Sequence, residues 1–179
     1  RDARGNVDKS VRLCHTMTKG GIPLNKTKFG LNATHLRILA LFLMLLDHLW
    51  ATVIPGNNWL TCIGRLAFPM FAFMLVEGYF HTHNLKRYVR RLVLFALISE
   101  IPFNLMYGSS PFYPLHQNVL WTLLIGLWMI HWNEQASKSG KPLKTQLTRV
   151  GTVFLGGLLG LLSFADYNAA GVLMILVFY

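Results

Sequence analysis

Long apolar runs separated by short polar stretches make up the sequence from residue 36 onward. A helix needs about 20 mostly apolar residues to cross a bilayer, and six runs meet or approach that length. They are 36–54, 60–80, 88–106, 115–132, 148–164 and 166–179. The pattern predicts an all-α fold, a polytopic bundle of about six transmembrane helices.

This pattern divides the chain into two parts. Residues 1–35 are polar and basic, and we expect them to form a cytoplasmic, poorly ordered N-terminal tail. Residues 36–179 form the transmembrane helical domain. The sixth apolar run has not ended at Tyr179, so we expect the helical domain to continue past this residue.

Composition and charge support a membrane protein. Hydrophobic residues make up 53% of the chain, charged residues make up 13%, and the mean hydropathy is +0.41. Soluble domains carry about 25% charged residues. The net charge of +10 does not indicate a nucleic-acid surface, because 16 of the 17 Lys and Arg residues lie beside alternate ends of the apolar runs. The positive-inside rule then places the N-terminus in the cytoplasm of a multi-pass protein.

Ionisable residues inside the apolar runs are the strongest functional signal. A charge at the centre of a bilayer costs about 2.5 to 3.5 kcal/mol on insertion scales, and such groups usually face a bundle interior or a watery cavity. The residues are Asp47, Arg65, Glu77, Glu100 and Asp166. One interpretation is structural, with Arg65 pairing with a carboxylate to fix helix packing. Glu77, near the cytoplasmic end and His81, fits a structural role best.

The predicted depth in the membrane places most of the remaining polar residues in the outer half. With the N-terminus inside, the groups on the outer half are Asp47, His48, Arg65, Glu100, His116, Gln117, Asn118 and Asp166. We therefore expect one outer cavity. Histidine side chains in general titrate near neutrality, so His48 is a candidate general base. Its neighbour Asp47 points about 100° away on a helix, so we expect Glu100 or Asp166 to orient His48. Asp47 is then left to meet Arg65, and Pro102 is expected to open the third helix beside Glu100.

Several motifs carry a resemblance to a known family. The stretches are "LLDHLWATVIP", "IGRLAFPMFAFMLVEGYFHTHNLKRYVRRLVLFALISEIPFNLMY", "HQNVLWTLLIGL" and "ADYNAAGVLMILVFY". Together they resemble, in order and over about Leu36 to Tyr179, the TraX family of bacterial membrane proteins, whose founding member is an F-pilin N-acetylase. Family-typical polar positions fall on Asp47, His48, Gly64, Arg65, Glu77, Gly78, Glu100, His116, Gln117, Asn118 and Asp166.

The resemblance implies an acetyltransferase in the bacterial cytoplasmic (inner) membrane. Acetyl-CoA on the cytoplasmic side would be the acyl donor. The acceptor would be an amine or hydroxyl on the outer side, in a pilin-like peptide of conjugation or another cell-envelope molecule. Transfer needs a base, a donor for the oxyanion and anchors for the CoA phosphates.

Each of these roles has candidate residues. For catalysis they are His48, Asp47, His116 and Glu100, with either histidine as the base. For the substrate and oxyanion they are Arg65, Gln117, Asn118 and Asp166. For the phosphates they are Lys86, Arg87, Arg90 and Arg91, although anionic lipid headgroups explain these four charges equally well.

Other function classes stay open at this stage. Acidic and histidine side chains inside a bundle also form proton relays, so a small proton-coupled transporter is one alternative. A structural component of a conjugation or secretion apparatus, with polar residues joining helices, is another. Cys14 and Cys62 have no metal-ligand spacing. We expect contact with the bilayer, no nucleic acid, and a possible homo-oligomer.

Overall fold

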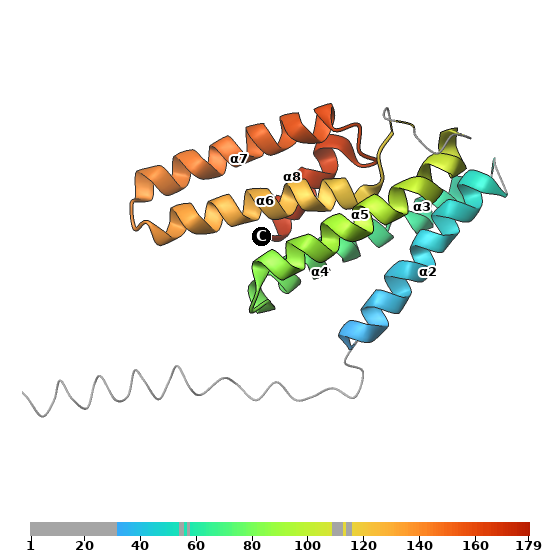
Figure 1. Cartoon of the computed structure of the whole chain (residues 1–179), viewed down its shortest axis with the longest axis horizontal. Coiled ribbons are helices and arrows are strands. Elements are labelled where there is room, and N and C mark those ends of the chain that lie inside the picture. The colour runs from blue at the N-terminus through green and yellow to red at the C-terminus, as the bar shows by residue number, and fades with distance from the viewer. Residues whose placement is uncertain (1–31, 54–55, 57, 109–112, 114–115) are drawn as a thin grey trace, which may run out of the picture. The chain divides into compact units, whose positions relative to one another are not determined.

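The computed structural model describes residues 32–53, 56, 58–108, 113 and 116–179, and these residues form helices joined by short turns (Figure 1). The helices are α2 (Ala33–Thr52), α3 (Asn58–Gly64), α4 (Ala67–His81), α5 (Leu85–Gly108), α6 (Val119–Lys138), α7 (Pro142–Leu162) and α8 (Asn168–Phe178). None of the described residues forms a named strand. The predicted all-α fold is confirmed. The predicted tail, 1–35, lies almost entirely outside the described residues.

The helix boundaries differ from the apolar runs in three places. The second run is broken at Arg65 and Leu66 into α3 and α4, so it is not one continuous helix. The helices α6 and α7 extend into polar sequence, to Lys138 and from Pro142, because solvated helix ends accept polar residues and proline. The expectation that Pro102 opens α5 is wrong, since the helix continues past it to Gly108.

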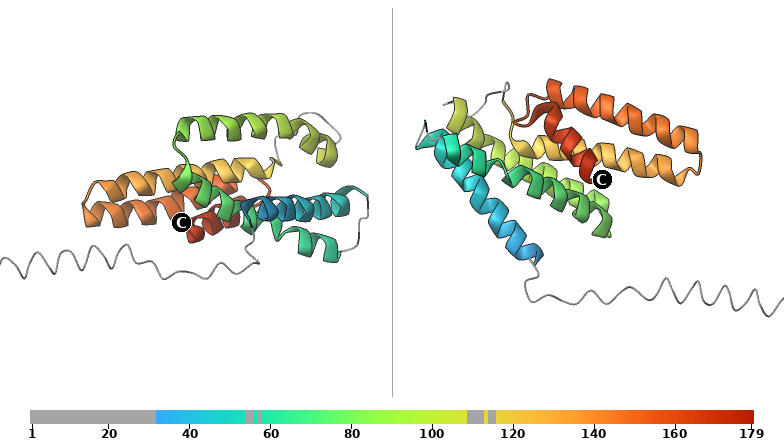
Figure 2. Two further views of the ribbon diagram at one scale, coloured as in Figure 1. Left: turned by 90° about the horizontal axis from the view of Figure 1, so that it is seen from below. Right: turned by 180° about the vertical axis from the view of Figure 1, so that it is seen from behind.

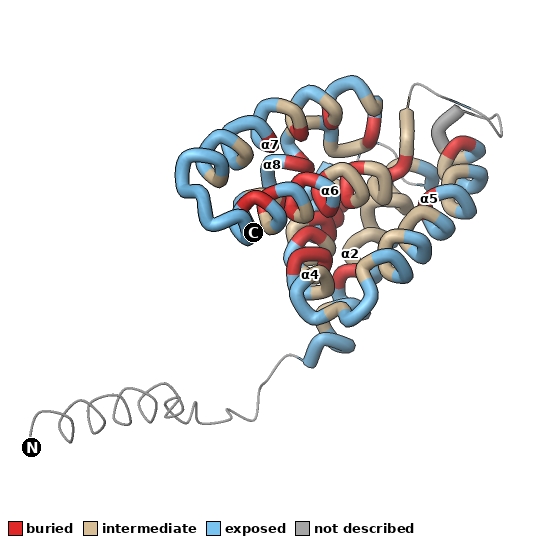
Figure 3. The backbone as a smooth tube through the Cα atoms, turned by 60° about the vertical axis from the view of Figure 1, so that its left-hand side comes forward, coloured by how far each residue is buried: buried red, intermediate tan, exposed pale blue. Residues whose placement is uncertain are grey.

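The core of the bundle lies around α6. This helix packs against α4, α5, α7 and α8, and eight of its residues are buried. The largest buried cluster joins α4 to α6 and α8; its buried members are Phe68, Ala72, Leu75, Val76, Leu123, Leu127, Ile130 and Ile175. Figure 3 shows the buried stretches concentrated in these three helices. Gly160 of α7 lets that helix approach the backbone of α8, because a Cβ there would lie 2.7 Å from the carbonyl oxygen of Asn168.

Helix α2 lies at the edge of this core. Only Ala40 is buried among its residues, and the first half of the helix is mostly exposed. Its firm contact is with α3, where a Cβ added at Gly64 would lie 2.6 Å from the Cβ of Asp47 and 2.7 Å from its backbone nitrogen. Only glycine permits this approach. The position of Asp47 and its neighbour His48 therefore depends on Gly64.

The outer surfaces of the helices are apolar. Phe154 on α7 is 75% exposed and Val177 on α8 is 82% exposed. Within the described part of the chain, Ala33–Thr52, Asn58–His81 and Pro142–Leu162 are long and apolar enough to cross a membrane. Exposed apolar side chains on helices of this length are what a lipid-facing surface requires.

Replacement of Gly64 by alanine tests the crossing of α2 and α3. The added methyl group meets backbone atoms that cannot rotate away, so we expect Gly64→Ala to destabilise the protein by about 1 to 3 kcal/mol, the usual cost of overpacking. The measurement is thermal unfolding of purified protein in detergent. Gly157→Ala is the matched control, because nothing lies within 4 Å of a Cβ at Gly157. Equal melting temperatures for the two variants would contradict the crossing.

Candidate functional site

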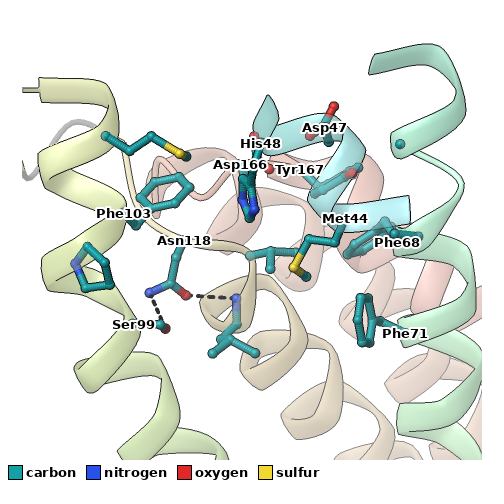
Figure 4. A pocket seen from close by; sticks show the side chains of 16 residues that line it. Met44, Asp47, His48, Phe68, Phe71, Ser99, Phe103, Asn118, Asp166 and Tyr167 are labelled. Carbon is teal, nitrogen blue, oxygen red and sulfur yellow. Dashed lines mark hydrogen bonds between the residues drawn. The ribbon is translucent and has the colours of Figure 1, made fainter. Parts of the chain in front are cut away.

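One cavity of about 350 Å³ lies where α2, α4 and α5 meet the start of α6 and the α7–α8 turn (Figure 4). Most of its lining is apolar or aromatic, from Met44, Ala67, Phe68, Phe71, Pro102, Phe103, Met106, Val119, Leu120 and Tyr167. The polar side chains in the lining are Asp47, His48, Ser99, Asn118 and Asp166. A mostly apolar cavity with a few convergent polar groups is typical of a small-molecule site.

Two adjacent residues of α2 have different surroundings. The Thr61 hydroxyl of α3 donates a hydrogen bond of 2.6 Å to Oδ1 of Asp47, while the His48 ring points into the cavity (Figure 4). The predicted pairing of Asp47 with Arg65 is wrong, because Arg65 lies exposed in the α3–α4 break and outside the cavity lining. Asp47 thus fastens α2 to α3, and His48 is presented to the cavity.

The carboxylate of Glu100 accepts hydrogen bonds outside the cavity lining. Its Oε2 accepts hydrogen bonds from the Asn118 side-chain amide and from Nε1 of Trp121, the latter at 3.0 Å. Glu100 itself does not line the cavity. The expectation that Glu100 orients His48 is therefore not met, since its carboxylate holds the start of α6 instead.

Asn118 begins α6 and connects it to α5. Its Oδ1 accepts from the backbone N–H of Leu120 at 3.0 Å, which caps the helix. Its Nδ2 has three acceptors on α5, namely Glu100 Oε2, the Ala96 carbonyl at 2.9 Å and Ser99 Oγ at 3.2 Å. Both amide protons are therefore already in use, and Asn118 is not placed to act as the predicted oxyanion donor.

Two backbone hydrogen bonds place His116 beside Asp166. The N–H of Gln117 donates to the Phe164 carbonyl at 2.9 Å, and the N–H of Asp166 donates to the Gln117 carbonyl at 3.1 Å. These bonds join the segment before α6 to the α7–α8 turn. His116 Nε2 lies 3.6 Å from Asp166 Oδ1, and its ring lies 5.1 Å from the Phe103 ring. His116 and Gln117 lie outside the cavity lining, and Asp166 lies within it.

The carboxyl of Asp166, in the turn outside the helices, has a shifted pKa. Burial raises the pKa of Asp166, the charge of Asp47 adds to this effect, and His116 and Arg65 oppose it. The result is a pKa above its ordinary value. Two carboxylates, Glu100 and Asp166, were expected as alternatives to orient His48. Of these two, Asp166 lines the cavity together with His48.

The structure thus brings together Asp47, His48, Asn118 and Asp166, and it leaves Arg65, Glu100, His116 and Gln117 outside the cavity lining. The four basic residues Lys86, Arg87, Arg90 and Arg91 are exposed near the start of α5, away from the cavity. Glu77 forms an exposed contact with His81, Oε2 to Nδ1 at 3.4 Å, and does not line the cavity.

Sequence reasoning missed several residues of the site. The chief ones are Met44, Thr61, Ser99, Phe103, Trp121 and Tyr167. Helical spacing alone could have found Met44, four residues before His48 on the same face. The others are apolar or uncharged residues within apolar runs, where only the packing of other helices distinguishes them.

These features define a polytopic α-helical membrane protein with a polar-edged cavity inside its bundle. The family described as TraX protein matches residues 32–179, and the chain belongs to the TraX family. It is 32% identical over 127 residues to the probable fimbrial assembly protein FimC, serogroup H1, of Dichelobacter nodosus, covering 65% of this chain and 51% of that protein.

Two further relatives carry the family name. The chain is 30% identical over 147 residues to protein TraX of Escherichia coli, covering 80% of this chain and 54% of that protein. It is also 30% identical over 145 residues to protein TraX of Escherichia coli strain K12, covering 79% of this chain and 53% of that protein. The chain therefore spans about half the length of the curated relatives it matches. No solved structure matches it.

Truncation of Glu100 tests its role at the start of α6. Glu100→Ala leaves the Asn118 amide and the Trp121 indole without their shared acceptor, so we expect a loss of about 1 to 3 kcal/mol in stability. The melting temperature in detergent should fall by several degrees. Glu77→Ala, which removes only an exposed contact, should change it little. A melting temperature for Glu100→Ala equal to that of Glu77→Ala would show that the network does not stabilise α6.

The raised pKa of Asp166 predicts a pH dependence of stability. In the unfolded chain this carboxyl loses its proton near 3.8, and the folded protein holds the proton to a higher pH. Stability should therefore fall as the pH rises from 3.8 through the raised pKa, because the folded state binds more protons there. Asp166→Asn should flatten this part of a melting-temperature profile in detergent. An unchanged slope in the variant would contradict the assignment.

Proposed function

We propose that the protein is an integral membrane acetyltransferase that takes acetyl groups from acetyl-CoA. One observation carries the proposal: an imidazole, His48, is presented to a cavity of ligand size within a chain of the TraX family. A His48 ring sealed among close-packed apolar side chains would have no access to a substrate. The cavity gives it that access.

The size of the cavity fits the reacting ends of two substrates. Ligand sites are typically about 300 to 1,000 Å³, and about 350 Å³ is at the lower end. This volume suits an acetyl thioester beside an amine or hydroxyl, whereas the nucleotide of CoA must lie elsewhere. The apolar lining excludes water, which protects an activated acyl group from hydrolysis.

Acetyl-CoA supplies an activated acyl group: a bond forms between the acetyl carbon and the acceptor nitrogen or oxygen, the carbon–sulfur bond breaks, and the proton lost by the acceptor ends on the CoA thiol. His48 is the group in the cavity that can hold this proton during transfer. Asp47 keeps His48 in place through Thr61. Arg65, the sequence candidate for stabilising negative charge on the acetyl oxygen, lies exposed and outside the cavity lining, so this role is not assigned to it.

The His116–Asp166 pair sits at the edge of the same site. Asp166 reaches the cavity lining and His116 lies directly behind it. This pair is a second place where a proton can be held, so His116 remains the alternative base.

The positive-inside rule supports an inner-membrane protein with a cytoplasmic N-terminus and the cavity towards the outer side. The acceptor is then an amine or hydroxyl of a pilin-like peptide or a cell-envelope molecule. One relative is named a probable fimbrial assembly protein, and this supports an acceptor in a surface appendage.

The direct test is transfer of radiolabelled acetyl from acetyl-CoA by purified protein in native membrane lipid, with cell-envelope extract as the source of acceptor. We expect His48→Ala to lower the rate by about 10² to 10⁴, the usual contribution of a general base. His116→Ala should lower it less. His83→Ala, an exposed histidine between α4 and α5, is the matched control and should retain the wild-type rate.

Thermal unfolding of each variant separates loss of catalysis from loss of folding. Full activity in a folded His48→Ala protein would refute His48 as the base. Failure of the wild type to bind CoA or to transfer label would refute the acetyltransferase itself, and would favour a proton-coupled transporter or a structural component instead.

A further inference from the structure

The faces of α2 and α5 that line the cavity continue beyond it, towards the beginnings of both helices. On α2, Met44 and His48 share a face with Leu41 and Arg37, because residues three or four apart are neighbours on a helix. Leu41 is 58% exposed, and Arg37 is exposed. The cavity-lining face of α2 therefore continues towards the beginning of the helix as an exposed surface, with Leu41 first and Arg37 at its end.

Helix α5 repeats this arrangement. Ser99 and Pro102 line the cavity, and Phe95 and Arg91 precede them on the same side of the helix. Phe95 is 62% exposed, and Arg91 is exposed. The cavity-lining face of α5 also ends at an arginine.

Each arginine is eleven residues before a cavity-lining residue of its own helix. Arg37 precedes His48 by eleven residues, and Arg91 precedes Pro102 by eleven residues. On an ideal helix this separation is about 16 Å of rise and about 20° of rotation, so each arginine lies three turns directly below its partner. The helices α2 and α5 run in the same direction in every view of Figures 1 and 2. Both arginines therefore mark the same end of the molecule.

A phosphate-bearing, chain-like ligand fits this length and charge. The pantetheine arm of CoA has about twelve bonds between its phosphate oxygen and its sulfur, and it spans about 15 Å when extended, given the 3.8 Å that three backbone bonds cover. That length equals the rise from Arg37 to His48. Arginine is well suited to phosphate, because its guanidinium donates paired hydrogen bonds.

We propose that Arg37 and Arg91 bind the phosphates of acyl-CoA and that the pantetheine arm lies between α2 and α5, with the thioester at His48. The inference rests on the proposed function and extends it to a donor site. It takes Arg91 from the basic run on α5 and adds Arg37 from α2, which was not among the sequence candidates for phosphate binding.

Two other basic residues of α5, Lys86 and Arg90, point away from this path, whereas Arg87 lies about 40° from Arg91 on the same side of the helix. Arg90 lies about 180° around the helix from Ser99, and Lys86 lies about 160° from Pro102. Both are exposed, as Arg91 is. Lys86 and Arg90 thus provide controls of equal charge on the same helix.

The experiment compares two double variants of the full chain in detergent: Arg37→Gln with Arg91→Gln, and Lys86→Gln with Arg90→Gln. CoA binding is measured by isothermal titration. We expect the arginine pair to weaken binding at least about tenfold, and the control pair to leave it within about twofold. With acetyl-pantetheine, a donor without the nucleotide phosphates, the arginine variant should transfer acetyl groups as fast as the wild type.

Three outcomes would overturn the inference. Equal weakening by both pairs would mean that general surface charge attracts CoA. Unchanged CoA affinity in the arginine pair, with weakened binding to phosphatidylglycerol vesicles relative to phosphatidylcholine vesicles, would assign the arginines to lipid headgroups. A wild type that binds no CoA would remove the proposed function as well, whereas wild-type binding that survives in the arginine pair removes only this donor site.

Discussion

The close crossing of α2 and α3 is the constraint on which the candidate site depends. Helix α2 has little other contact with the bundle, and Gly64 lets its backbone approach α3 at Asp47. The Thr61 hydrogen bond then fixes the rotation of α2. Because His48 follows Asp47 directly, the same crossing decides that the imidazole faces the cavity. A costly intramembrane carboxylate thus has a mechanical role, while the adjacent histidine remains available for chemistry.

The opposite wall of the cavity is fixed in a comparable way. Glu100 on α5 collects donors from Asn118 and Trp121, and Asn118 also caps α6. Buried polar groups of this kind stabilise only when their partners are present, so the network holds α5 and α6 in one arrangement. In both walls of the cavity, an ionisable residue therefore joins neighbouring helices through hydrogen bonds. The cavity-lining polar side chains outside these hydrogen bonds include His48 and Asp166.

The sequence predicted the helices and the gathering of polar residues at one end, because lipid demands long apolar runs and makes exceptions visible. It did not predict the partners. Asp47 was expected beside Arg65, and Glu100 or Asp166 beside His48, because the sequence shows which residues are charged but not which helices cross. The actual partners, Thr61 and Asn118, are neutral, and only the crossing of helices brings them near. The break at Arg65 was also invisible to hydropathy, since the residues on both sides are apolar.

The backbone hydrogen bonds between Gln117 and the α7–α8 turn affect how the sequences of related proteins can diverge. His116 is positioned by backbone hydrogen bonds to residues more than forty positions later, and these bonds are indifferent to the side chains involved. Related chains can therefore change the side chains at Gln117 and Phe164 and still keep His116 beside Asp166.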